Sequence, residues 1–380
     1  MREMKDSGVE WLGEVPAGWS VVPVKRVAVL RHGSDPQKDG DVPVYGSGQF
    51  AFKTCGEFKE GPTVLLGRKG TLNCPQYIVG RYWNVDTAFD TVIRSNEMLL
   101  KYFYYSISSV DVGDLSTNTA KPSMTQGAWY SVKLPKPPLD EQRRIAGYLD
   151  EKCAEIDRAV SAAERSIEEY KLLLSAVIDE RFSQYGGRVK LSRISSLITD
   201  GDHQAPPRSD VGIPFLVISN ISKGKIDFSN TDYVPEKYYE SLPISRRAQK
   251  GDVLVSVTGS YGIPVVVDVE RPFCFQRHIA LVRPSVNPDY IRFAMKTTEF
   301  SQYCDGVVTG AAQKTLTLGC LRSAPIIDVP SAEVDMLVGD LLAKEVVIDR
   351  AIAAKQAIIA DLKAYKQSLI YETVTGKREV

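Results

Sequence analysis

The sequence predicts an α+β protein, with two globular mixed α/β domains related by pseudo-two-fold symmetry and separated by two long antiparallel coiled-coil helices. Three observations predict this fold. The string Ile-Asp-Arg-Ala occurs at residues 156–159 and again at 348–351. Each copy lies in a long proline-free stretch with apolar residues at heptad spacing. A region of short strand-like runs precedes each of these stretches.

The repeat extends well beyond the four-residue string. Glu141 aligns with Glu333, Pro138 with Pro330, and the loop 119–125 with 311–317, all at one offset of 192 residues and without a gap. Solenoid repeats have periods of about 20–50 residues, so this is a duplicated domain. The predicted boundaries are 1–138 for the first globular domain, 139–186 for the first helix, 187–329 for the second domain and 330–380 for the second helix.

The first domain contains short apolar runs broken by Gly, Pro, Asn and Asp, which predict strands and turns. These runs are PVKRVAVL, TVLLG, QYIVG and FDTVI, and the segment NEMLLKYFYYSIS predicts a helix. From Ile156 the apolar residues of the next stretch recur at alternating steps of four and three, which predicts a heptad seam. A helix over this stretch would span roughly 65–70 Å at 1.5 Å per residue.

The second half repeats the plan with the strand-like runs PFLVIS, DVLVSVTG, PVVVDV and HIALVRP, and the helical segment DYIRFAMKTT. Its long helix has a less regular seam, because Lys355 and Lys366 stand where the first copy has Ala163 and Leu174. Two alternatives follow. Either the lysines lie at the edge of the seam with their amines in water, or the packing shifts to neighbouring apolar side chains, Ile358 and Tyr365.

A helix that is apolar along one stripe must bury that stripe. Each long helix could pack on its own globular domain, but the duplication favours packing of the two helices on each other. The first helix leads into the second domain and the second helix returns from it, so the pair should be antiparallel. The expected interface comprises Ile156, Val160, Ile167, Leu174, Leu341, Ile348, Ile352, Ile359, Leu362 and Leu369.

Composition excludes several classes of protein. The 47 basic and 47 acidic residues balance, so no overall charge favours nucleic acid or a membrane. The six cysteines form no Cys-x-x-Cys pair and, with three histidines, give no zinc spacing. We therefore expect free thiols in a reducing cytoplasm, with no metal site and no cofactor. The chain has no apolar run near the ~20 residues of a membrane helix, so no membrane association is expected.

Four phrases resemble the specificity subunit of type I restriction-modification systems. They are DSGVEWLGEVPAGW near the N-terminus, KLPKPPLDEQRRIAGYLD across the start of the first long helix, the repeated Ile-Asp-Arg-Ala helix, and a glycine turn after a strand, LLGRKGTLN and VSVTGSYG. The resemblance covers nearly the whole chain. The second copy departs from it, since VPSAEVDMLVGDLL keeps Pro330 and Glu333 but lacks the PLxEQ string.

The resemblance implies two target recognition domains, each reading one half of a bipartite site in double-stranded DNA. It implies that the helices set the gap between the halves and dock two modification (methyltransferase) subunits, with restriction subunits joining through the complex. Methylation and cleavage would belong to those partners. Accordingly, the sequence contains neither the Asn-Pro-Pro-Tyr motif of an amino-methyltransferase nor a phosphate-binding Gly-x-x-x-x-Gly-Lys-Ser/Thr loop. We expect no catalytic residues. The alternative is a coiled-coil assembly scaffold whose globular domains bind protein.

Three pairs of corresponding segments are candidates for DNA contact, because Arg and Lys neutralise phosphates while Arg, Asn and Gln also read base edges. The first pair is the two glycine turns, the second is a polar loop at constant offset in both copies, and the third is the loop after each domain's first strand. Each could instead be a solvated turn, and the sequence does not decide which residue reads a base. The candidates are Arg31, His32, Arg68, Lys69, Asn73, Asn118, Lys121, Ser123, His203, Gln204, Thr258, Ser260, Tyr261, Gln313, Lys314 and Thr315.

Overall fold

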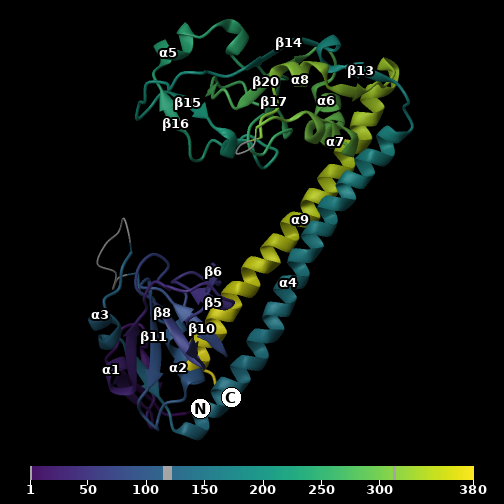
Figure 1. The fold of residues 1–380 in the computed structure, drawn as a ribbon. Helices are drawn as coiled ribbons and strands as arrows, with labels where there is room; N and C mark the ends of the chain where they lie inside the picture. The colour runs from purple at the N-terminus through teal and green to yellow at the C-terminus, as the bar shows by residue number, and fades with distance from the viewer. Residues whose placement is uncertain (1, 114–121, 311–313) are drawn as a thin grey trace. The chain divides into compact units, whose positions relative to one another are not determined.

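The computed structural model describes residues 2–113, 122–310 and 314–380. The chain forms two compact units. The first unit comprises Met1–Glu164 and Gln356–Val380, and the second comprises Arg165–Lys355. Each unit contains a globular part and a portion of both long helices (Figure 1).

The first unit is built around a four-stranded antiparallel sheet in the order β4-β11-β8-β9, which packs beside a second sheet in the order β6-β5-β10-β7. In the second sheet β5 and β10 are parallel. The bounds are β4 Ala28–His32, β11 Ala88–Ile93, β8 Thr63–Gly67, β9 Gln76–Ile78, β6 Lys53–Cys55, β5 Val42–Tyr45, β10 Arg81–Asn84 and β7 Lys59–Glu60. Two strand pairs and three helices complete it: β1 Met4–Asp6 with β2 Glu14–Pro16, β3 Ser20–Pro23 with β12 Lys133–Lys136, α1 Val24–Val27, α2 Leu100–Ser108 and α3 Gln126–Ser131.

The second unit has the same plan, with a central antiparallel sheet in the order β14-β20-β17-β18 and a smaller sheet in the order β16-β15-β19. The strand bounds are β14 Ser195–Asp200, β20 Ile279–Pro284, β17 Val253–Ser256, β18 Pro264–Val266, β16 Asp232–Val234, β15 Ile213–Leu216 and β19 Cys274–Phe275, with β13 Arg188–Lys190 paired to β21 Pro325–Ile327. Its helices are α5 Glu236–Ser241, α6 Pro288–Ala294, α7 Thr298–Val307, α8 Leu318–Ser323 and three short 3₁₀ turns, Leu191–Arg193, Ile218–Asn220 and Ile244–Arg246.

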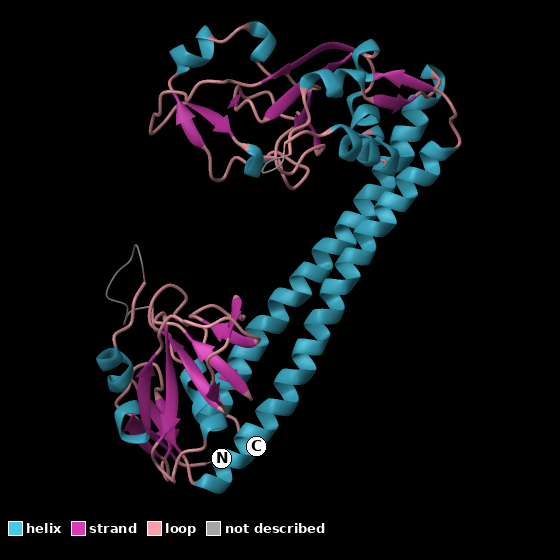
Figure 2. Ribbon diagram, viewed as in Figure 1, coloured by secondary structure: helices cyan, strands magenta, loops and turns pink. Residues whose placement is uncertain are grey.

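The duplication is visible in details of the elements. Helices α3 and α8 begin 192 residues apart, and each is capped by a threonine, Thr125 or Thr317, whose hydroxyl accepts a backbone N–H of the first turn. The two long helices, α4 (Leu139–Ser183) and α9 (Ser331–Val374), also start 192 residues apart. The predicted α+β fold with two long helices is confirmed (Figure 2).

The long helices run antiparallel in each unit. In the first unit Asp157 of α4 pairs with Lys366 of α9, with 2.7 Å between carboxylate and ammonium, and Glu164 lies 3.7 Å from Lys363. In the second unit Arg181 pairs with Asp340. Rising numbers on α4 therefore face falling numbers on α9, as two antiparallel helices require.

The helix seam is buried to different extents along its length. The buried members are Ile156, Val160, Ile167, Leu341, Ile348 and Leu369, and the half-buried members are Leu174, Ile352, Ile359 and Leu362. Of the two alternatives for the irregular α9 seam, the structure favours the first. Lys366 lies at the edge of the seam on Asp157, whereas Ile358 and Tyr365 are about half exposed.

One run differs from the predicted strand pattern. The run PVKRVAVL begins with the helical turn α1 and becomes a strand at Ala28. Val24 and Val27, three residues apart, are both buried while Lys25 and Arg26 are exposed, so the spacing is helical.

The residues that the structure describes contain no helix that combines the length and apolar character needed to cross a membrane.

Candidate nucleic-acid interface

In the first unit, two of the segments that the sequence singles out meet at one end of the central sheet. Strand β8 ends at Gly67, and the turn that follows pairs with the end of the polar loop through an antiparallel bridge between Lys69 and Ser123. The backbone N–H of Gly70 donates to the carbonyl of Pro122 at 2.9 Å, and the N–H of Met124 donates to the carbonyl of Arg68 at 2.9 Å. The turn therefore lies side by side with residues 122–124.

The second unit makes the same junction with different side chains. Thr258, which follows β17, forms an antiparallel bridge with Thr315. The N–H of Gly259 donates to the carbonyl of Lys314 at 3.0 Å, and the N–H of Leu316 donates to the carbonyl of Val257 at 2.8 Å. We call the end of each central sheet that carries this junction the junction end.

Glycine is required at both turns for a backbone reason. Gly70 has φ +84° and Gly259 has φ +72°, in the left-handed region that other residues seldom adopt. A side chain at Gly67 would also place its Cβ only 2.4 Å from the carbonyl oxygen of Thr71. These glycines hold the backbone close to its neighbours and direct the intervening side chains outward.

Arg68 and Lys69 share one acidic neighbour at the surface. The guanidinium of Arg68 lies 2.8 Å from Oδ2 of Asp86, and the ammonium of Lys69 lies 3.2 Å from the same oxygen. The hydrogen bond from Lys69 lowers the pKa of the Asp86 carboxyl. Two cations on one exposed carboxylate leave a net positive charge, which suits a phosphate.

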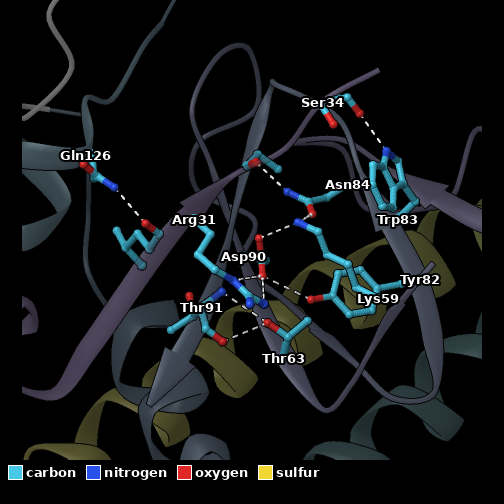
Figure 3. A network of polar contacts seen from close by, with 12 residues as sticks. Arg31, Ser34, Lys59, Thr63, Tyr82, Trp83, Asn84, Asp90, Thr91 and Gln126 are labelled. Atoms are coloured by element: carbon cyan, nitrogen blue, oxygen red, sulfur yellow. Dashed lines mark hydrogen bonds and ion pairs between the residues drawn. The ribbon is translucent and has the colours of Figure 1, made fainter. Parts of the chain in front are cut away.

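Arg31 and His32 lie on the last two residues of β4, at the junction end of the sheet, and not in the loop that follows. Arg31 is anchored to the buried carboxylate of Asp90 on the neighbouring strand, with Nε donating to Oδ2 at 2.8 Å (Figure 3). The ring of His32 packs edge-on against Phe89, with 4.9 Å between centroids. The Arg31 side chain is half exposed, so its outer edge reaches solvent while its inner edge is fixed.

The Asp90 carboxylate, which is 0% exposed, is held by a network that joins the two sheets of the first unit (Figure 3). Lys59 of β7 donates to Oδ1 of Asp90 at 2.8 Å and to Oδ1 of Asn84 at 2.7 Å. The hydroxyl of Tyr82 donates to Oδ2 at 3.3 Å. Burial, together with the charge of Asp90, raises the pKa of Tyr82 to about 12, so this phenol remains a donor.

In the second unit, candidates from three segments line one open depression of about 390 Å³ at the junction end. Nε2 of His203 lies 2.7 Å from Oδ2 of Asp200, the last residue of β14. The hydroxyl of Thr258 lies 3.0 Å from Nδ1 of His278. The residues lining the depression are Asp200, His203, Val257, Thr258, Arg277, His278, Thr315, Leu316, Thr317 and Leu318.

The remaining candidates have varied settings. Gln204, Ser260 and Lys314 are exposed, and Tyr261 donates its hydroxyl to Asp305 at 2.7 Å. Asn73 accepts the backbone N–H of Val112 at 3.2 Å. Three further candidates lie outside the described residues: Asn118, Lys121 and Gln313.

No group of three or more potential metal-ligating side chains gathers anywhere in residues 2–113, 122–310 or 314–380.

Comparison with known proteins agrees with this architecture. The chain is 20% identical over 345 residues to the type I restriction enzyme MjaVIII specificity subunit of Methanocaldococcus jannaschii, covering 83% of this chain and 76% of that protein. It is 23% identical over 284 residues to the EcoBI specificity subunit of Escherichia coli, covering 63% and 57% respectively. The chain is a homologue of the type I specificity subunits. The resemblance predicted from the sequence is confirmed.

A solved structure gives the same fold. One chain in a structure of a type I restriction-modification system, studied for complex assembly and conformational transition, aligns with a TM-score of 0.68 and 18% identity, covering 96% of this chain and 99% of that one. No family model matches the sequence.

Several residues at or near the junction ends were not among the candidates from the sequence. Arg277 and His278 follow β19 and line the depression in the second unit. Burial, together with the charge of Arg277, lowers the pKa of His278, which favours its neutral form. The sequence signal that could have identified them is the adjacent pair Arg277-His278 between two apolar strands. Lys59 gave no comparable signal, because its partner Asp90 lies 31 residues away.

Proposed function

We propose that this chain is the DNA-reading subunit of a type I restriction-modification complex, and that each unit reads one half of a bipartite site. The single observation that supports this most is the repeated junction. In each unit the glycine turn pairs with the end of the polar loop, at the corresponding end of that unit's own central sheet. The backbone geometry is shared while the side chains differ, as expected for two readers of unrelated sequences.

The two junctions should read DNA by different means. The first presents Arg68, Lys69 and the anchored Arg31, which can neutralise phosphates or bind guanine. The second presents Arg277 and the imidazole of His278, whose Nδ1 lies against the buried hydroxyl of Thr258. We propose residues 1–138 and 187–329 as the target recognition domains, with catalysis left to partner subunits and no cofactor in this chain.

We propose further that two modification subunits dock on the long helices. Several large apolar side chains on α4 and α9 face solvent, including Leu172 at 70% exposed and Val347 at 65%. Exposed apolar surface of this kind marks protein–protein contact sites. Restriction subunits would then join through the complex.

Electrophoretic mobility shift with the purified chain, alone and with its modification subunits, tests the function. A DNA reader should shift duplexes from its own genome in a sequence-dependent way once the subunits are added. An assembly scaffold, the alternative, should assemble with protein and give no sequence-dependent shift.

Changing Lys69 to alanine should weaken DNA binding about equally for all sequences, because a phosphate contact carries no base information. The slope of log affinity against log salt should become shallower by about 0.9. Filter binding at several salt concentrations measures both. Lys250→Ala is the matched control, since Lys250 is exposed before β17, at the opposite end of the second unit's central sheet. An unchanged slope for Lys69→Ala would exclude this contact.

The long helices should set the gap between the half-sites. Deleting one heptad from both 156–177 and 348–369 shortens each helix by about 10 Å at 1.5 Å per residue. The preferred gap should then shorten, or binding should be lost, while each half-site keeps its sequence. If the shortened protein still methylated the original site at its original gap, the helices would not set the gap.

A further inference from the structure

The loop between β5 and β6 of the first unit, residues 46–52, exposes two aromatic side chains that the sequence did not suggest as functional. Phe50 is 74% exposed and Phe52 is 60% exposed. The same unit buries the rings of Phe89 and Phe103 completely. Two solvent-facing phenylalanines within three residues indicate a surface that is covered by a partner.

This aromatic loop lies against the glycine turn that carries Arg68. Gln76 donates to the carbonyl of Gly46 at 2.8 Å. A Cβ at Gly46 would lie 2.8 Å from Oγ1 of Thr87 and 3.7 Å from the Phe52 ring. The carbonyl of Thr87 in turn accepts the backbone N–H of Arg68 at 2.8 Å. The ring of Phe52 is therefore close to the backbone of the proposed DNA-reading turn.

The charges around the loop favour nucleic acid over an apolar protein surface. The ammonium of Lys53 lies 5.7 Å from the centroid of Phe52, and the Arg68–Lys69 pair adds positive charge at the adjoining turn. Proteins that deform DNA combine basic groups, which hold the phosphates, with an apolar wedge that enters a base step. Aromatic rings also stack on bases without sequence preference.

We propose that Phe50 inserts at one base step of the half-site bound by the first unit and partly unstacks it, with Phe52 supporting the loop from the protein side. This rests on the proposed function. Phe50 is the more exposed ring, and the Phe52 ring lies only 3.7 Å from where a Cβ at Gly46 would stand, which assigns the two roles. In the second unit Phe228, after β15, packs on Phe273 with 6.0 Å between centroids. The distortion should therefore be confined to one half-site.

The test uses the full chain assembled with its modification subunits and duplexes that contain the site found by methylation mapping. The fluorescent base 2-aminopurine is placed at successive positions of each half-site. Its emission should rise on binding at one step of the first half-site, and Phe50→Ala should abolish the rise and weaken binding by about 10-fold. Phe50→Trp should retain tight binding.

Phe58→Ala is the matched control. Phe58 is 50% exposed and stacks on Arg81, at the end of β10 away from Thr87, so this change should affect neither signal. Wild-type affinity and fluorescence in Phe50→Ala would overturn the wedge. The wedge would also be overturned if Phe50→Ala weakened the binding of modification subunits but left the DNA binding of the assembled complex unchanged. A wild-type complex with no sequence-specific binding would reject the proposed function and the wedge with it.

Discussion

Replacing Asp90 with alanine is expected to lower the free energy of unfolding of the first unit by about 3 kcal/mol. The change removes a fully buried carboxylate and leaves Arg31 and Lys59 without their shared counter-charge. Breaking a buried ion pair from one side costs about 3–5 kcal/mol, and the half-exposed Arg31 places this case at the low end. At about 2–4 °C per kcal/mol for a unit of this size, the melting temperature should fall by roughly 6–12 °C.

Asp86→Ala provides the matched control for this measurement. Asp86 also binds two cations, Arg68 and Lys69, but its side chain is half exposed. Surface ion pairs contribute about 0–1 kcal/mol, so calorimetry should detect little change. Equal melting temperatures for the two variants would show that the Asp90 network does not hold the two sheets together.

Replacing Ile156 with aspartate is expected to destabilise the first unit by at least about 4 kcal/mol. Ile156 is buried in the hydrophobic cluster that also contains Leu149, Val160 and Leu369. Truncating a buried isoleucine costs about 2–5 kcal/mol, and burying an unpaired carboxylate adds to this. Urea unfolding followed by circular dichroism measures the loss.

Leu172→Asp is the control on the same helix. Leu172 is 70% exposed, so its change should alter stability by no more than about 0.5 kcal/mol. If Ile156→Asp were equally mild, the packing of α9 on α4 would contribute little to the first unit.

The long helices were predictable because their signal is local. The heptad seam and the proline-free run place the first helix at 139–186, and α4 spans Leu139–Ser183. The second helix was predicted within 330–380, and α9 spans Ser331–Val374. The small sheet of the first unit was not predictable in the same way. Its strands have two to four residues, and the parallel pairing of β5 with β10 joins Val44 to Trp83 across a long stretch of chain.

The candidate site was only partly predictable for the same physical reason. Glycine after an apolar strand is a local signal, and it located the turns at Arg68 and Thr258. The pairing of each turn with a loop more than fifty residues later depends on the folded sheet, and so do the Asp90 network and the position of Phe50. These features arise from contacts between distant residues, which no short pattern encodes.

The most direct test of independent half-site reading is a chimera in which residues 21–135 are replaced by the matching segment of a relative. Mapping N6-methyladenine across the genome of cells that carry the chimera with its partner subunits returns both half-sites and the gap together. One half-site is expected to change to that of the relative, while the other half-site and the gap stay as they were. A change in both half-sites, or in the gap, would contradict it.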